Sequence, residues 1–140
     1  MTPNVVLAYA RHGYRVDLGN PSIISARLIQ NGSEVATGGG IPVAATAVFF
    51  AISRVAPELS SWFIVGNAFG YSTLVLADLF PRATIDVIDA ETEGAANKTG
   101  SSLTRQIALE SFPQRAIDGR FLTAGDPQSR APFSLWRCLY

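Results

Sequence analysis

Residues 62–73 read WFIVGNAFGYST and place a short apolar run directly before a glycine-containing turn. The apolar run, 62–65, holds aromatic and β-branched residues without polar alternation, which is typical of a strand buried on both faces of a sheet. Gly66 and Gly70 let the backbone of the turn pass close to a ligand. A strand, a turn and a helix that begins near Tyr71 are therefore predicted here.

Helical and strand patterns alternate on both sides of this stretch. Pro42 suits the first turn of a helix, and Pro57 and Pro81 end two helical patterns. The expected elements are helices over 42–56, 71–80 and 95–111 and strands over 62–65, 84–88 and 121–123. This alternation favours an α/β fold with βαβ units and a parallel sheet. Ligands of such sheets bind at the carboxyl ends of the strands.

The first 40 residues carry weaker signals. Residues 4–10 are apolar and fit either a strand or a short helix. Pro21 and the repeat of Ile23, Ile24, Arg27 and Leu28 favour a helix that Asn31-Gly32 ends. Three glycines at 38–40 form a flexible break. We therefore expect a helical or irregular segment over 1–40 and an incomplete cofactor-binding domain over 41–140.

The composition narrows the classes of function. The chain has 140 residues, of which 48% are hydrophobic and 16% are charged, and its formal net charge is zero. The hydrophobic share is enough for a core. No basic excess is present to neutralise a phosphate backbone, so no nucleic-acid partner is expected. The charged share is low against about 25% in average domains, which suggests that part of the surface is normally covered.

Single cysteine and histidine residues limit the chemistry further. With one Cys (Cys138) and one His (His12), the chain offers neither a disulfide framework nor a Cys/His zinc site, and no metal is expected. His12 is interpreted as a surface or capping residue. No secretory signal and no apolar run of about 20 residues is visible. We therefore expect a cytoplasmic protein without a membrane partner.

Three loops after the predicted strands carry residues suited to one ligand. The first is the glycine turn. The second holds Asp89, which lies 19 residues after Gly70, the spacing at which an acid accepts the ribose hydroxyls of an adenosine. The third holds Gly125-Asp126, where a carboxylate can accept from the adenine amino group. Taken singly, Asp89 and Asp126 are equally well explained as a helix cap or a solvated loop acid.

Phosphate-bearing ligands fit the turn poorly. A dinucleotide site would have G-x-G-x-x-G, and a phosphate loop would have G-K-[ST]. The turn has only Gly66 and Gly70, and the sole lysine of the chain is Lys98. A nicotinamide- or flavin-binding unit is therefore a less favoured alternative.

Residues 64–74 resemble the first motif of class I S-adenosylmethionine-dependent methyltransferases, most closely the small-molecule O-methyltransferases of the catechol and caffeoyl-CoA type. Residues 85–91 and Gly125-Asp126 are similar to the second and third motifs. The resemblance implies a Rossmann-like three-layer αβα fold, S-adenosyl-L-methionine as cofactor and methyl transfer to a small-molecule acceptor. It implies as cofactor-binding residues Gly66, Asn67, Ala68, Phe69, Gly70, Tyr71, Ser72, Asp89, Ala90 and Asp126. Phe69 and Tyr71 also fit ordinary packing positions.

The chain departs from this family in two places. Ile64 stands where the family has an acid two residues before the first glycine. Residues 131–140 do not resemble the family's fourth strand, so catalytic residues and metal ligands cannot be assigned. We therefore expect a chain truncated after its third strand, with an unpaired sheet edge through which two copies could pair. A non-catalytic fragment or assembly module is the alternative.

Overall fold

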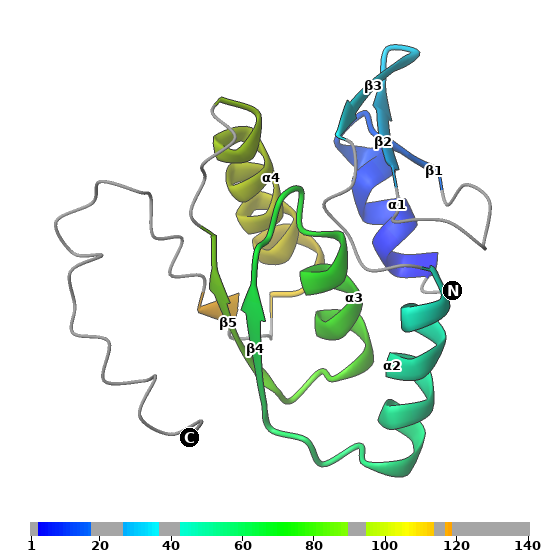
Figure 1. Cartoon of the computed structure of the whole chain (residues 1–140), viewed down its shortest axis with the longest axis vertical. Coiled ribbons are helices and arrows are strands. Elements are labelled where there is room, and N and C mark those ends of the chain that lie inside the picture. Colours follow the sequence, from blue (N-terminus) through cyan, green and yellow to red (C-terminus); the bar gives the residue numbers. More distant parts are fainter. Residues whose placement is uncertain (1–2, 18–26, 37–42, 90–94, 114–116, 119–140) are drawn as a thin grey trace, which may run out of the picture.

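Four helices and two small sheets make up the described part of the chain, which is a mixed α/β arrangement (Figure 1). The structure is a computed structural model that describes residues 3–17, 27–36, 43–89, 95–113 and 117–118. One sheet is antiparallel and is built from residues 15–36, in the N-terminal part of the sequence. The other is parallel and carries the predicted glycine turn.

The parallel sheet consists of β4 (Ser61–Val65), β5 (Thr84–Ile88) and β6 (Ile117–Asp118), in the order β4-β5-β6. Helix α3 (Tyr71–Leu79) connects β4 to β5, and α4 (Ala95–Ser111) lies between β5 and β6. Both strand pairs are parallel. The predicted alternation of strands and helices is thus confirmed from β4 to β6. The strand next to β5 is at 117–118, and the predicted strand at 121–123 lies outside the described residues.

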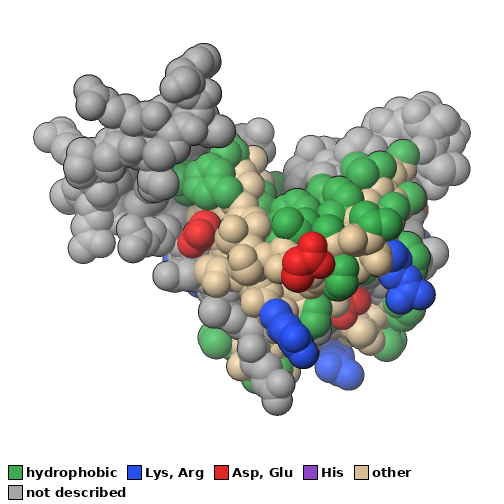
Figure 2. All heavy atoms as spheres, turned by 90° about the horizontal axis from the view of Figure 1, so that it is seen from below, with side chains coloured by type: hydrophobic (Ala, Val, Ile, Leu, Met, Phe, Trp, Pro, Cys, Tyr) green, Lys and Arg blue, Asp and Glu red, His purple; other side chains and the backbone are tan. Residues whose placement is uncertain are grey.

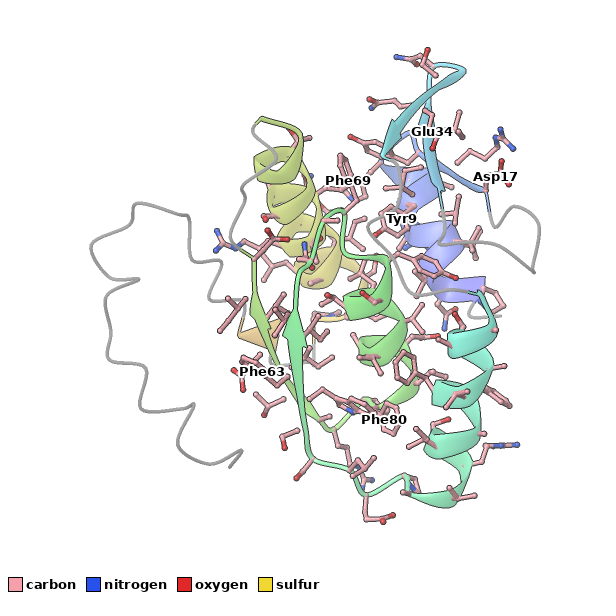
Figure 3. All side chains as sticks on the ribbon, in the orientation of Figure 1. Tyr9, Asp17, Glu34, Phe63, Phe69 and Phe80 are labelled. Atoms are coloured by element: carbon pink, nitrogen blue, oxygen red, sulfur yellow. The ribbon has the colours of Figure 1, made fainter. Side chains whose placement is uncertain are left out.

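Helices α2 (Val43–Val55) and α3 cover one face of the parallel sheet. Trp62 on this face has its ring centroid 4.8 Å from that of Phe80 and 5.7 Å from that of Phe49. On the opposite face, Phe63 and Val65 are 57% and 76% exposed. The prediction of a strand buried on both faces was wrong, because α2 and α3 pack only against the face that carries Trp62. Figure 3 shows Phe63 and Phe80 on opposite sides of β4.

Helix α3 lies at the centre of the packing. All its residues from Tyr71 to Ala77 are buried, as expected for a helix with neighbours all round. Helices α1 (Pro3–Arg11) and α4 pack against it through a second apolar cluster, which contains Val5, Tyr9, Leu74, Val75, Leu103 and Ile107. The parallel unit and the N-terminal helix therefore share one core.

The N-terminal sheet was not predicted. It consists of β1 (Arg15–Asp17), β2 (Arg27–Gln30) and β3 (Ser33–Ala36), all antiparallel. The predicted helix that Asn31-Gly32 would end was wrong over Arg27–Gln30, which form β2, and its earlier part at 21–26 lies outside the described residues. The pair Asn31-Gly32, interpreted as a helix stop, forms the hairpin turn with φ of 51° and 78°. Positive φ at both positions is what a two-residue hairpin turn requires.

The outward faces of the helices are unusually apolar. In α2, Phe49 and Ile52 face the sheet, whereas Val48, Phe50 and Val55 are at least half exposed. Leu109 in α4 is 76% exposed. Figure 2 shows hydrophobic side chains between scattered charged groups at the end of the molecule where α2 leads into β4. None of the helices in the described part is both long and apolar enough to cross a membrane.

Candidate functional site

The glycine turn after β4 alternates between positive and negative φ. Gly66, Ala68 and Gly70 have φ of 85°, 46° and 79°. Ala68 is the unusual member, since non-glycine residues seldom adopt positive φ. Alternation of this kind turns successive N–H groups toward one side and forms a concave anion site, or nest.

The nest is filled by the carboxylate of Asp89. The N–H groups of Asn67 and Ala68 both donate to Oδ2 of Asp89, at 2.6 and 2.8 Å. The N–H of Gly66 donates to the carbonyl of Ile88 at 2.7 Å and extends the β4–β5 ladder into the turn. The structure therefore brings together the turn and the acid that sequence spacing paired. Contact between Asp89 and a ribose stays a prediction.

Strand alternation delivers Asp89 to this position. Ile85 and Val87 are buried against α2 and α3, and Asp89 continues the same face just beyond the end of β5. Asp86 points to the other face and is exposed, in keeping with the alternation of side chains along a strand. Asp89 is only 5% exposed, so most of its carboxylate is in contact with protein.

Asn67 supports the turn from inside. Its side chain is fully buried and lies between α3 and α4. Its Oδ1 accepts from the Thr73 hydroxyl at 2.8 Å, and its Nδ2 donates to Oγ1 of Thr104 at 3.0 Å. The Thr104 hydroxyl in turn donates to the carbonyl of Gly100 at 2.8 Å. The side chain of Asn67 thus fixes the turn to two helices.

Two glycines allow α4 to touch the turn. A Cβ at Gly100 would lie 2.0 Å from the Ala68 carbonyl oxygen, and a Cβ at Gly70 would lie 2.0 Å from Oγ1 of Thr104. The spacing of Gly100 and Thr104, one helical turn apart, is the signal that could have identified a contact face on α4.

The remaining predicted residues divide into two groups. Phe69, Tyr71 and Ser72 lie at the turn and at the start of α3, and all three are less than 9% exposed. Phe69 and Tyr71 also belong to the apolar cluster with α1. Burial raises the pKa of the Tyr71 phenol, and the Thr46 hydroxyl lowers it in part. Ala90 and Asp126 lie outside the described residues.

A cleft of about 400 Å³ lies elsewhere on α4, lined by Tyr14, Thr99, Ser102, Leu103 and Gln106. It contains none of the predicted cofactor-binding residues. Within the described ranges, no group of three or more His, Cys, Asp or Glu side chains could hold a metal ion. Comparison of the chain with protein-family models, curated proteins and solved structures finds no match.

Proposed function

We propose that the chain is the cofactor-binding part of a class I methyltransferase and binds S-adenosyl-L-methionine at the turn 66–70 and Asp89. The observation that carries the proposal is the seat of Asp89. A buried carboxylate stands at the carboxyl ends of two adjacent parallel strands and holds the backbone of a glycine turn. On this proposal the parallel unit is part of a Rossmann-like three-layer αβα fold.

The chemistry of the turn favours a ligand without phosphate. A phosphate in the nest would need the N–H groups of Asn67 and Ala68, which already donate to Asp89. The carboxylate would also repel a phosphate at this distance. An adenosine with a sulfonium side chain has no such conflict, since its ribose hydroxyls donate to a carboxylate and its cation is attracted by one. This argument disfavours the nicotinamide or flavin alternative.

Residues of this chain would mainly position the two reactants. Asp89 and the backbone of 66–72 would orient the nucleoside, with Ala90 and Asp126 proposed to flank the adenine. Because Ile64 replaces the family's acid, backbone carbonyl groups of the turn would accept from the ammonium group of the methionine end, since the N–H groups of Asn67 and Ala68 already donate to Asp89. The bound cofactor supplies an activated methyl group, which is transferred to a small-molecule acceptor by in-line displacement. Such catalysis draws largely on orientation.

Calorimetric titration with S-adenosylhomocysteine tests the proposal. We expect saturable binding that Asp89→Asn weakens at least tenfold, because the amide keeps one acceptor oxygen for the turn but loses the charge. Asp86→Asn is the matched control, since Asp86 lies in β5, three residues before Asp89, and faces the opposite side. Absence of binding by the folded wild-type chain, or equal loss in both variants, would contradict the proposal. NAD should not compete.

The open face of β4 favours a second candidate function, an assembly module that pairs with a second copy of itself. Phe63 and Val65 expose apolar area beside the strand edge that does not pair with β5. We expect sedimentation to show a dimer that the double variant Phe63→Ser/Val65→Thr shifts to monomer. A wild-type monomer at high concentration would count against this function.

A further inference from the structure

The N-terminal helix reaches the glycine turn through one buried side chain. Tyr9 of α1 is fully buried, and its hydroxyl donates to the carbonyl of Phe69 at 2.5 Å, across 60 residues of sequence. Figure 3 shows Tyr9 and Phe69 close together between α1 and the turn. Packing alone usually explains a tyrosine that is buried this deeply. The Tyr9 hydroxyl, however, also uses its one O–H to hydrogen-bond the turn.

The other supports of the turn come from the parallel unit. Asp89 holds two N–H groups from the end of β5, and Thr104 holds the Asn67 side chain from α4. The N–H of Gly70 donates to the carbonyl of Asn67 at 2.7 Å. The Phe69 carbonyl is oriented by α1, which lies outside that unit. It belongs to the peptide that joins Phe69 to Gly70, where the chain turns into α3.

The chemical state of Tyr9 suits this contact. Burial raises the pKa of its phenol well above the ordinary value, and the neighbouring Tyr71 raises it further. The hydroxyl therefore stays protonated and able to donate throughout the neutral range. The position of the ring is fixed as well, since Val5 and Ala8 on the same helix are fully buried.

We infer that Tyr9 is a positioning residue of the candidate site, whose hydroxyl fixes the Phe69–Gly70 peptide and makes helix α1 part of that site. The effect on cofactor affinity rests on the proposed function. The effect on the turn itself does not. On this inference the turn reaches its binding geometry only when α1 is docked against α3 and α4.

Replacement of Tyr9 by Phe tests the inference, with Tyr14→Phe as the matched control. Both tyrosines belong to the same apolar cluster, and both variants remove one hydroxyl only. We expect hydrogen exchange at the amides of Asn67, Ala68 and Gly70 to quicken about tenfold in Tyr9→Phe, the factor that corresponds to about 1.4 kcal/mol for one lost hydrogen bond. The interior amides of α3 should keep their wild-type protection, and S-adenosylhomocysteine should bind about tenfold more weakly.

Distinct outcomes separate this inference from the proposed function. Unchanged exchange at the turn, or an equal increase throughout α3, would overturn the inference. Faster exchange at the turn in a chain that never binds S-adenosylhomocysteine would support the inference and refute the proposed function. If Tyr9→Phe does not fold, NMR of the wild type decides. The Tyr9 hydroxyl proton should be observed in slow exchange with a contact to the Gly70 amide, and its absence would overturn the inference.

Discussion

The two faces of the parallel sheet differ sharply. On the covered face, Ile85 and Val87 are at most 1% exposed, and Trp62 packs edge-on and tilted against two phenylalanines. On the open face, Phe63 and Val65 are more than half exposed and stand beside the exposed Asp86. Hydrophobic stabilisation follows the area removed from water, so the covered face should carry nearly all of it.

The covered face also builds the site. Its alternate residues along β5 end in Asp89, and β4 leads into Gly66, whose N–H bonds to the end of β5. The candidate site is therefore the continuation of the packed face, and Asp89 lies two residues beyond Val87, the last apolar side chain of that face on β5. Substitutions on the covered face should therefore disturb the turn, whereas substitutions on the open face should leave it unchanged.

The largest expected effect compares Ile85→Ala with Phe63→Ala. Deleting a buried isoleucine side chain costs about 2–5 kcal/mol, because the cavity does not fully close. Truncating the half-exposed Phe63 to alanine should lower the unfolding free energy by less than about 1 kcal/mol. Urea denaturation of both variants measures the difference. A loss for Phe63→Ala as large as that for Ile85→Ala would show that the open face is covered in solution.

A second comparison uses two glycines with nearly the same φ. Gly70 and Gly32 have φ of 79° and 78°, but a Cβ at Gly70 would collide with Thr104, whereas nothing lies within 4 Å of Gly32. In both alanine variants the left-handed φ should lower the unfolding free energy by about 1–2 kcal/mol. Gly70→Ala should lose about 1–3 kcal/mol more through overpacking. Equal losses in thermal or urea unfolding would mean that α4 does not press on the turn.

Sequence reasoning recovered what depends on local pattern. Helices α2, α3 and α4 and strands β4 and β5 follow from proline stops and apolar periodicity, and the pairing of Asp89 with the turn follows from the length of one βα unit. Patterns of residue type could not show that Phe63 is exposed, because burial depends on what else covers the sheet. They also failed over 27–36, where Asn31-Gly32 suits a helix stop and a hairpin turn equally.

The supports of the turn were beyond local reasoning for a related reason. Tyr9 is 60 residues from Phe69, and Thr104 is 37 residues from Asn67. Neither partner has a motif of its own, since a tyrosine in an apolar helix and a threonine in a polar one are ordinary residues. Only the packing of α1 and α4 on α3 brings them to the turn.

A third comparison tests the inner network of the turn against a surface contact. Asn67→Ala removes the acceptor of the buried Thr73 hydroxyl and should cost about 1–3 kcal/mol. Asn4→Ala removes an exposed hydrogen bond from Asn4 Nδ2 to Asp78 Oδ1 of 3.0 Å and should change the unfolding free energy by no more than about 0.5 kcal/mol. Urea denaturation of the two variants measures both losses of unfolding free energy. Similar small losses would indicate that water replaces the Asn67 network.

The smallest effect is confined to alkaline solution. The folded pKa of Tyr9 lies above its ordinary value of 10.0, so near and above that pH the unfolded chain releases the proton while the folded chain keeps it. The folded state then binds more protons, and its stability falls as pH rises. Below the unfolded pKa the full contribution is present. We expect urea unfolding between pH 8 and pH 11 to show a steeper loss for the wild type than for Tyr9→Phe, with Tyr71 leaving a residual slope in both because burial also raises its pKa. If the unfolding free energies of the wild type and Tyr9→Phe fell in parallel with pH, the Tyr9 phenol would be accessible to water. Its hydrogen bond to the turn would then be weaker, and so would the link between α1 and the covered face.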